Sequence, residues 1–133
     1  MPFETQLTDD YMGIIHVGKG IVTGDEIVEG CRAVTALVET TENFHYKLVD
    51  LTGASDLEVS EEQLREIVEE DRRIAAARPR IAVGIVAPND KMRAIAEQWE
   101  HSVAELGWNT YIARSRGEAL KWLRENAAAP VVI

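Results

Sequence analysis

The most constraining feature of this sequence is a short apolar segment at residues 80–86 (RIAVGIV), which lies between Pro79 and Pro88. After its first residue the segment has no polar side chain, so it lacks the alternation of a strand with one face in water. A continuous apolar run of this length predicts a central β-strand that is covered on both faces. Such a strand needs other strands beside it and helices packed against the sheet.

The rest of the chain alternates between strand-like and helix-like patterns. Two helix starts carry capping boxes, in which Thr23 is followed by Glu26 and Ser60 by Gln63. Strands are predicted at residues 2–8, 11–17, 45–51, 80–86 and 108–113, with helices after Thr23, Ser60, residues 88–90 (ending before Gly107) and Ser115. The order β-β-α-β-α-β-α-β-α predicts an α/β fold with a single five-stranded mixed sheet and four helices. The first strand is expected to run antiparallel at an edge, and residues 1–133 are expected to form one domain.

The composition narrows the classes of partner. Asp and Glu number 23 against 14 Lys and Arg, so the net charge of −9 repels nucleic-acid phosphates and anionic lipid headgroups. No apolar run approaches the ~20 residues of a membrane-spanning helix, and the acidic first residues do not form a signal peptide. The single cysteine, Cys31, excludes an internal disulfide and metal sites built from cysteine pairs. We therefore expect a cytoplasmic protein that contacts neither nucleic acid nor a membrane.

No cofactor or metal motif has the correct spacing. Residues 18–20 (GKG) and Gly24 suggest a phosphate-binding loop, but they fit neither a dinucleotide fingerprint nor a Walker A loop. These glycines are predicted to form a turn before the first helix. His16, His45 and His101 are scattered along the chain without ligand spacing. We expect no cofactor, no metal and no catalytic residue.

Asp71 is the most informative polar residue. On the second helix, positions 64, 67, 68, 74 and 75 form an apolar stripe, and position 71 falls inside it. A carboxylate directed toward a core is costly unless it is paired. Either Asp71 lies at the edge of the stripe and is paired near Arg72 or with Arg78 or Arg80, or it lines a cavity and anchors a ligand, with a raised pKa.

The cavity interpretation predicts a ligand pocket between the second and third helices and the sheet. Its wall would contain Ile67, Asp71, Ile74 and Trp99. A hydrolase that uses Asp71 with one of the histidines would require an imidazole within hydrogen-bond reach of that carboxylate.

Two surface features suggest contacts with other proteins. Residues 56–71 carry eight acids and one base, whereas residues 72–93 carry six bases and one acid, so a partner protein could dock by charge complementarity. The chain ends in Val131-Val132-Ile133, three apolar β-formers that gain nothing in water. This tail is predicted to pack on an exposed sheet edge or on a second copy in a homodimer.

Three segments resemble the SpoIIAA-like proteins, which are bacterial relatives of the STAS domain and are also compared with Sec14-type lipid carriers. The resemblance rests on residues 45–51 (HYKLVDL), on residues 80–86 and on the last helix at residues 118–123 (EALKWL). The element order matches that fold over residues 11–126. The resemblance implies a STAS-like α/β fold and a regulatory, non-enzymatic module in the bacterial cytoplasm.

The resemblance also points to Ser60. In the anti-sigma-factor antagonists, a strand ending in Asp-Leu-Ser-Gly leads to a turn with a phosphorylated serine, and residues 50–53 (DLTG) match the first part. Ser60 then falls on the phosphorylated position, although Glu58, Val59 and Glu61 replace the residues that usually flank it. Ser60 is either a phosphorylation site or a plain helix N-cap.

Together these observations predict a module that binds a partner protein or a small ligand without catalysis. The alternative is a carrier or sensor of a small apolar or amphipathic molecule, such as a lipid-like compound. A carrier would contain a cavity of ligand size, whereas a partner-binding module would be solid inside.

Overall fold

A computed structural model describes residues 2–39 and 43–133 of the chain. The elements along the chain are β1 (Phe3–Leu7), β2 (Gly13–Thr23), α1 (Gly24–Val38), β3 (Tyr46–Glu58), α2 (Glu61–Ala77), β4 (Ala82–Val86), α3 (Asp90–Ser102), the 3-10 turn η1 (Ala104–Leu106), β5 (Asn109–Ala113) and α4 (Arg116–Asn126). The five strands form one sheet in the order β1-β2-β3-β4-β5. β1 pairs antiparallel with β2 at one edge, and the other pairs are parallel. The predicted α/β fold and element order are confirmed.

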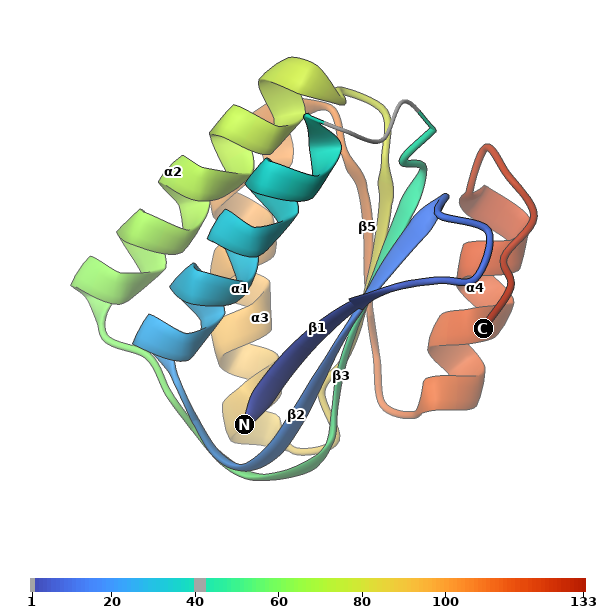
Figure 1. Ribbon diagram of the computed structural model, residues 1–133. Coiled ribbons are helices and arrows are strands. Elements are labelled where there is room, and N and C mark those ends of the chain that lie inside the picture. The colour runs from blue at the N-terminus through green and yellow to red at the C-terminus, as the bar shows by residue number, and fades with distance from the viewer. Residues whose placement is uncertain (1, 40–42) are drawn as a thin grey trace.

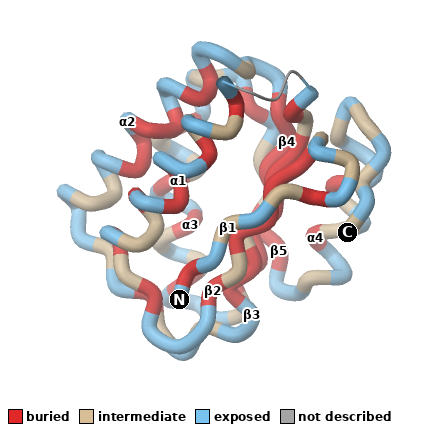
Figure 2. The backbone as a smooth tube through the Cα atoms, in the orientation of Figure 1, coloured by how far each residue is buried: buried red, intermediate tan, exposed pale blue. Residues whose placement is uncertain are grey.

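The sheet separates two unequal helical layers. Helices α1, α2 and α3 cover one side, which we call the three-helix face, and α4 alone covers the other, which we call the α4 face (Figure 1). β4 begins two residues later than predicted, and all five of its residues are buried, as expected for a strand covered on both faces (Figure 2). Each side therefore has its own apolar cluster, one built around Val34, Ile74 and Val83 and the other around Tyr46, Leu48 and Leu123.

Local capping signals determine where the helices begin. Thr23 and Ser60 form the two predicted capping boxes, with Glu26 and Gln63 as their partners. The Ser115 side chain accepts a hydrogen bond from the backbone N–H at the third position of α4. Each cap of this kind stabilises a helix by about 1 kcal/mol.

β2 and β3 are longer than the sequence predicts. Neither the turn expected at residues 18–20 nor the strand end expected at residues 52–53 forms, because the two strands continue to pair with each other as far as Thr23 and Glu58. The register shifts beside Gly20, whose φ of 64° is favourable for glycine and allows the strand to bend. β4 and β5 end earlier, opposite Asp50. Residues 18–23 and 51–58 therefore form a two-stranded arm that curves toward the three-helix face (Figure 1).

The third helix is shorter than its apolar pattern predicts. α3 ends at Ser102, and the one-turn helix η1 follows it. Gly107, expected just after the helix, has a φ of 85° and ends η1 instead. Within the described residues, no helix combines the length and the apolarity needed to cross a bilayer.

Candidate functional site

A cavity of about 70 Å³ lies inside the three-helix face, between the sheet and helices α1, α2 and α3. Its wall is mostly apolar, with Leu51 and Leu57 from the arm, Ile67 from α2, and Ile95 and Trp99 from α3. The arm closes one end of this space because β2 and β3 run past β4. The cavity therefore lies between the second and third helices and the sheet, where the sequence places the ligand pocket.

Asp71 lies at the inner end of this cavity and is 1% exposed. Its Oδ2 accepts a hydrogen bond of 2.7 Å from Trp99 Nε1, and its Oδ1 lies 3.7 Å from Lys47 Nζ. Burial raises the pKa of Asp71, and the nearby Lys47 charge and the hydrogen bonds oppose this effect without cancelling it. The cation beside Asp71 is therefore Lys47, and not Arg78 or Arg80 as in the first sequence interpretation.

Lys47 is a residue that the sequence interpretation missed. It belongs to β3, is 3% exposed, and its Nζ lies 5.7 Å from the centre of the Trp108 ring. The strand alternation carries the relevant signal, since Tyr46 and Leu48 face α4 and Lys47 must then face the other three helices. A lysine on the inner side of an apolar strand indicates a buried partner of opposite charge.

His16 is the second missed residue and comes from β2. Its side chain is 1% exposed, and Nδ1 forms a 2.7 Å hydrogen bond with Thr5 Oγ1. The ring stacks on Phe3 with centroids 5.0 Å apart, and Nε2 has no hydrogen-bond partner among the residues described. Burial and the positive charge of Lys47 hold the pKa of His16 well below its usual value, so the ring is neutral at pH 7.

Cys31 completes the polar end of the cavity from α1. Its Sγ donates a weak hydrogen bond of 3.8 Å to Asp71 Oδ1. Burial and the neighbouring Asp71 carboxylate raise the pKa of this thiol, so it stays protonated. Cys31 is buried on the apolar side of its helix, as predicted.

The wall of the cavity comes close to the surface between α2 and α3. Leu64 and Ile95 line the cavity there and are only partly buried. Leu64 also lines a surface groove between the same two helices, together with Arg65 and Gln98. The interior space and the groove thus share a wall at Leu64.

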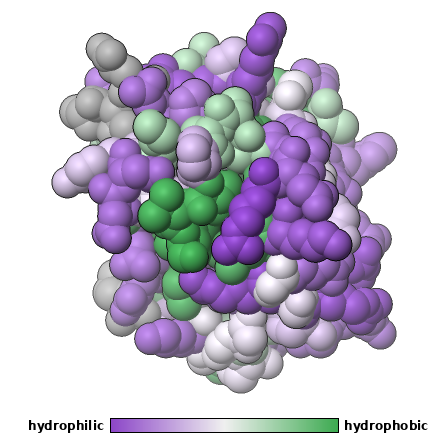
Figure 3. Space-filling view, turned by 90° about the vertical axis from the view of Figure 1, so that its right-hand side faces the viewer, coloured by the Kyte–Doolittle hydropathy of each residue, from purple (hydrophilic) through white to green (hydrophobic). Residues whose placement is uncertain are grey.

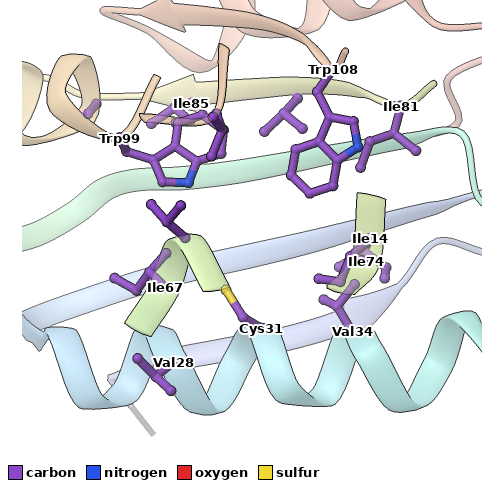
Figure 4. Close-up of a cluster of buried hydrophobic side chains, with 14 of the residues drawn as sticks. Ile14, Val28, Cys31, Val34, Ile67, Ile74, Ile81, Ile85, Trp99 and Trp108 are labelled. Atoms are coloured by element: carbon purple, nitrogen blue, oxygen red, sulfur yellow. The ribbon is translucent and has the colours of Figure 1, made fainter. Parts of the chain in front are cut away.

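Of the four residues predicted to line a ligand pocket, three line this cavity: Ile67, Asp71 and Trp99. Ile74 does not line it but lies fully buried in the surrounding core, one turn further along α2. Figure 4 shows Trp99 reaching in from α3 while Cys31 rises from α1 on the other side of the space. The helical stripe identifies which residues face inward, but it does not indicate where along α2 the packing leaves room.

A hydrolase that uses Asp71 with a histidine would need a hydrogen bond between the two side chains. His16 lies on the same side of the sheet as Asp71, but its Nδ1 bonds Thr5. In residues 2–39 and 43–133, no hydrogen bond joins Asp71 to a histidine, and no group of three or more His, Cys, Asp or Glu side chains is arranged to hold a metal ion.

Ser60 lies outside the cavity, at the exposed start of α2. Its Oγ accepts a 3.1 Å hydrogen bond from the Gln63 backbone N–H, and the Gln63 side chain in turn bonds Asp25 of α1. The structure shows the N-cap role directly, and phosphorylation of Ser60 stays a prediction.

The C-terminal tail lies against the α4 face of its own chain. Val131 and Ile133 pack on the apolar cluster there, and the Val132 backbone N–H donates a 3.1 Å hydrogen bond to the Tyr46 hydroxyl. Figure 3 shows a group of hydrophobic side chains in the middle of this face, surrounded by hydrophilic ones. The tail thus covers a sheet face within the chain, rather than a sheet edge.

Comparison with known proteins supports the fold. No family model and no curated protein matches the chain. The solved structure of the anti-sigma factor antagonist SpoIIAA in its unphosphorylated form is similar, with a TM-score of 0.56 and 15% identity over 92% of this chain and 97% of SpoIIAA. An uncharacterised protein of the DUF3478 family with a SpoIIAA-like fold, from Shewanella loihica, matches with a TM-score of 0.54 and 15% identity over 91% of each chain. The chain therefore has the SpoIIAA-like fold that its sequence predicts.

Proposed function

We propose that this protein is a non-enzymatic module that binds a small amphipathic molecule in the cavity of the three-helix face. The observation that carries the proposal is an apolar cavity with ionisable side chains at its buried end. Such a site offers apolar contact to the body of a ligand and a few polar groups to orient it. The Nε2 of the buried His16, which has no partner in the described part of the chain, supports this, because unsatisfied buried polar atoms are rare in folded proteins.

The size of the cavity limits what it can hold. A cavity of about 150 Å³ holds a benzene molecule in a well-studied case, and the cavity in this protein has about half that volume. It can accept a polar group and a few carbon atoms, but not a whole lipid. A longer ligand would extend past Leu64 into the groove between α2 and α3.

A partner protein would bind to the module with an affinity that depends on whether the cavity holds a ligand. SpoIIAA, which shares the fold, is an anti-sigma factor antagonist. Arg72 and Arg73 of α2 and Lys91 of α3 are exposed and pair with acidic side chains of their own chain, so this side of the molecule offers charged groups to a partner. We place this module in the cytoplasm, in keeping with its acidic surface.

The proposal is tested by NMR titration with 1-hexanol, a neutral amphipathic probe. We expect chemical-shift changes in the backbone amides of β2, β3, α2 and α3 around the cavity. The Leu64→Trp substitution should abolish them because the larger side chain fills the space at this wall of the cavity.

Leu120→Trp is the matched control, since Leu120 is a partly buried leucine of α4 on the other side of the sheet. This variant should bind 1-hexanol as the unmodified protein does. Failure of the unmodified protein to bind, or equal binding by both variants, would contradict the proposal.

A further inference from the structure

The buried end of the cavity contains more hydrogen-bond donors than acceptors. The ammonium group of Lys47 has three N–H donors, and its nearest carboxylate oxygen, Asp71 Oδ1, is 3.7 Å away, beyond hydrogen-bond length. Asp71 Oδ2 already accepts from Trp99, and Oδ1 accepts the weak bond from Cys31. Trp99 and Cys31 thus use two of the roughly four lone-pair sites of this carboxylate, and the sites that remain are fewer than the N–H donors of Lys47 and His16 among the described residues.

His16 provides a further donor. The Thr5 hydroxyl can donate to Nδ1 over the 2.7 Å separation, which leaves the ring proton on Nε2. The same hydroxyl can accept a proton from Nδ1 if the ring becomes charged. Thr5 thus holds the ring in one orientation in both protonation states.

The sheet register brings His16 and Lys47 close together. His16 pairs with Val49 across β2 and β3, and Lys47 lies two residues before Val49 on the same face. Neighbouring strands lie about 4.8 Å apart and two residues along a strand span about 6.6 Å, so the two side chains leave the sheet about 8 Å apart, a span that one carboxylate can bridge between two long side chains.

We infer that the ligand is a small monocarboxylic acid, whose carboxylate accepts hydrogen bonds from His16 Nε2 and Lys47 Nζ and whose alkyl chain leaves past Leu64 and Ile95. This inference rests on the function proposed above and adds the chemical class of the ligand. Charge-assisted hydrogen bonds to a carboxylate are stronger than neutral ones, especially in an apolar surrounding.

Binding of such an anion should be coupled to uptake of a proton. The groups that face His16 are Lys47 from β3, Asp71 from α2, Cys31 from α1, and Thr5 and Phe3 from β1. Lys47 and Asp71 balance each other, so an added carboxylate leaves one uncompensated negative charge in the cavity. Protonation of His16 compensates that charge, and affinity should therefore increase as the pH falls.

The experiment compares hexanoate with 1-hexanol, which has the same chain length but no charge, by calorimetric titration at pH 8 and pH 6. We expect hexanoate to bind at least fivefold more tightly at pH 6, with proton uptake visible as a dependence of the heat on the buffer. Binding of 1-hexanol should not change with pH.

Two variants test whether the pH dependence of hexanoate binding arises at His16. His16→Asn should remove the pH dependence of hexanoate binding. Thr5→Val, a conservative change on edge strand β1, should weaken hexanoate binding several-fold and 1-hexanol binding much less, because it removes only the hydroxyl that orients the imidazole toward a charged ligand.

The outcomes separate the inference from the proposed function. If 1-hexanol binds and hexanoate does not, or if hexanoate binding is independent of pH, the carboxylate inference is overturned and the proposed function stands. If neither probe binds, both are overturned. If hexanoate still binds to Leu64→Trp, the carboxylate site is elsewhere, and the inference is again overturned.

Discussion

The buried polar groups on the two faces of the sheet differ in how their hydrogen bonds are satisfied. On the α4 face, the Tyr46 hydroxyl bonds the tail, and Asp50 accepts hydrogen bonds from Thr52 and, at 2.7 Å, from Arg116. Burial alone would raise the pKa of Asp50, but these bonds outweigh it and lower the pKa. On the three-helix face, burial raises the pKa of Asp71 in spite of its contacts with Lys47 and Trp99.

This difference indicates that the α4 face mainly stabilises the fold, whereas the three-helix face contains the candidate binding site. The buried polar groups on the α4 face form hydrogen bonds with one another or with the tail, so they stabilise the fold without a ligand. The inner end of the cavity leaves His16 Nε2 without a partner among the described residues, which costs stability unless a ligand or solvent satisfies it. Proteins commonly accept such a cost at binding sites.

The largest expected effect tests the charged pair of the three-helix face. Lys47→Met should reduce the free energy of unfolding by about 3–5 kcal/mol at pH 8, because it leaves Asp71 buried without its cation. The loss should be smaller at pH 5, where Asp71 can bind a proton. Urea unfolding at both pH values measures it.

Lys91→Met is the matched control, since Lys91 forms an exposed ion pair of 2.7 Å with Asp56. This substitution should cost less than about 1 kcal/mol. Equal losses in the two variants would mean that the buried pair has no special importance.

The second effect tests the packing of the α4 face. Leu123 is fully buried and packs over Gly84 of β4. Leu123→Ala should cost about 3 kcal/mol in urea unfolding, through lost burial and the void it leaves. Binding of 1-hexanol to the other face should be unchanged, and a parallel loss of binding would show that the two faces are not independent.

A third effect concerns the C-terminal tail, which packs over the α4 face. Deletion of residues 131–133 should reduce the free energy of unfolding by about 2 kcal/mol, because two half-buried apolar side chains and the hydrogen bond to Tyr46 are lost. Sedimentation should not change if the tail acts within one chain. A shift from dimer to monomer on deletion would instead support the homodimer predicted from the sequence.

The smallest effect is the pH dependence of stability that His16 imposes. Its pKa in the folded protein lies well below the 6.5 of the unfolded chain, so the unfolded state binds more protons below that pH. The contribution of the neutral His16 to the free energy of unfolding is therefore fully present above pH 6.5. It decreases as the pH falls below that value, by up to about 1.4 kcal/mol per pH unit. Asp71 acts in the opposite direction: its raised pKa favours the folded state at low pH, and this contribution is lost as the pH rises above 3.8.

Comparison of variants separates the two contributions. The difference in unfolding free energy between the unmodified protein and His16→Asn should change between pH 7 and pH 5. The control His101→Asn changes an exposed residue of α3 and should show no such trend. A constant difference for His16→Asn would contradict the assignment of a buried neutral imidazole.

Sequence reasoning succeeded for features that depend on near neighbours. The capping boxes at Thr23 and Ser60 correctly predicted two helix starts, and Asp71 was singled out because a single helix shows its inward stripe. It failed for β2 and β3, where glycines suggested a turn, because the bend at Gly20 is stabilised by pairing with Ala54, which lies 34 residues further along the chain. Ile74 was placed in the pocket for a related reason, since its position on the stripe is correct but the packing around it is tight.

By itself, the sequence determined the order of the elements, the buried central strand and the position of Asp71 within the apolar stripe of its helix, because these follow from hydrophobic periods and capping bonds within a few residues. Tertiary structure decided that His16, Cys31, Lys47 and Asp71 converge on one cavity, since they come from four elements whose register and packing no local pattern contains. It also decided that the tail lies on its own α4 face. Buried charges find their partners through the whole fold, and so the chemistry of the site is a property of the assembled chain.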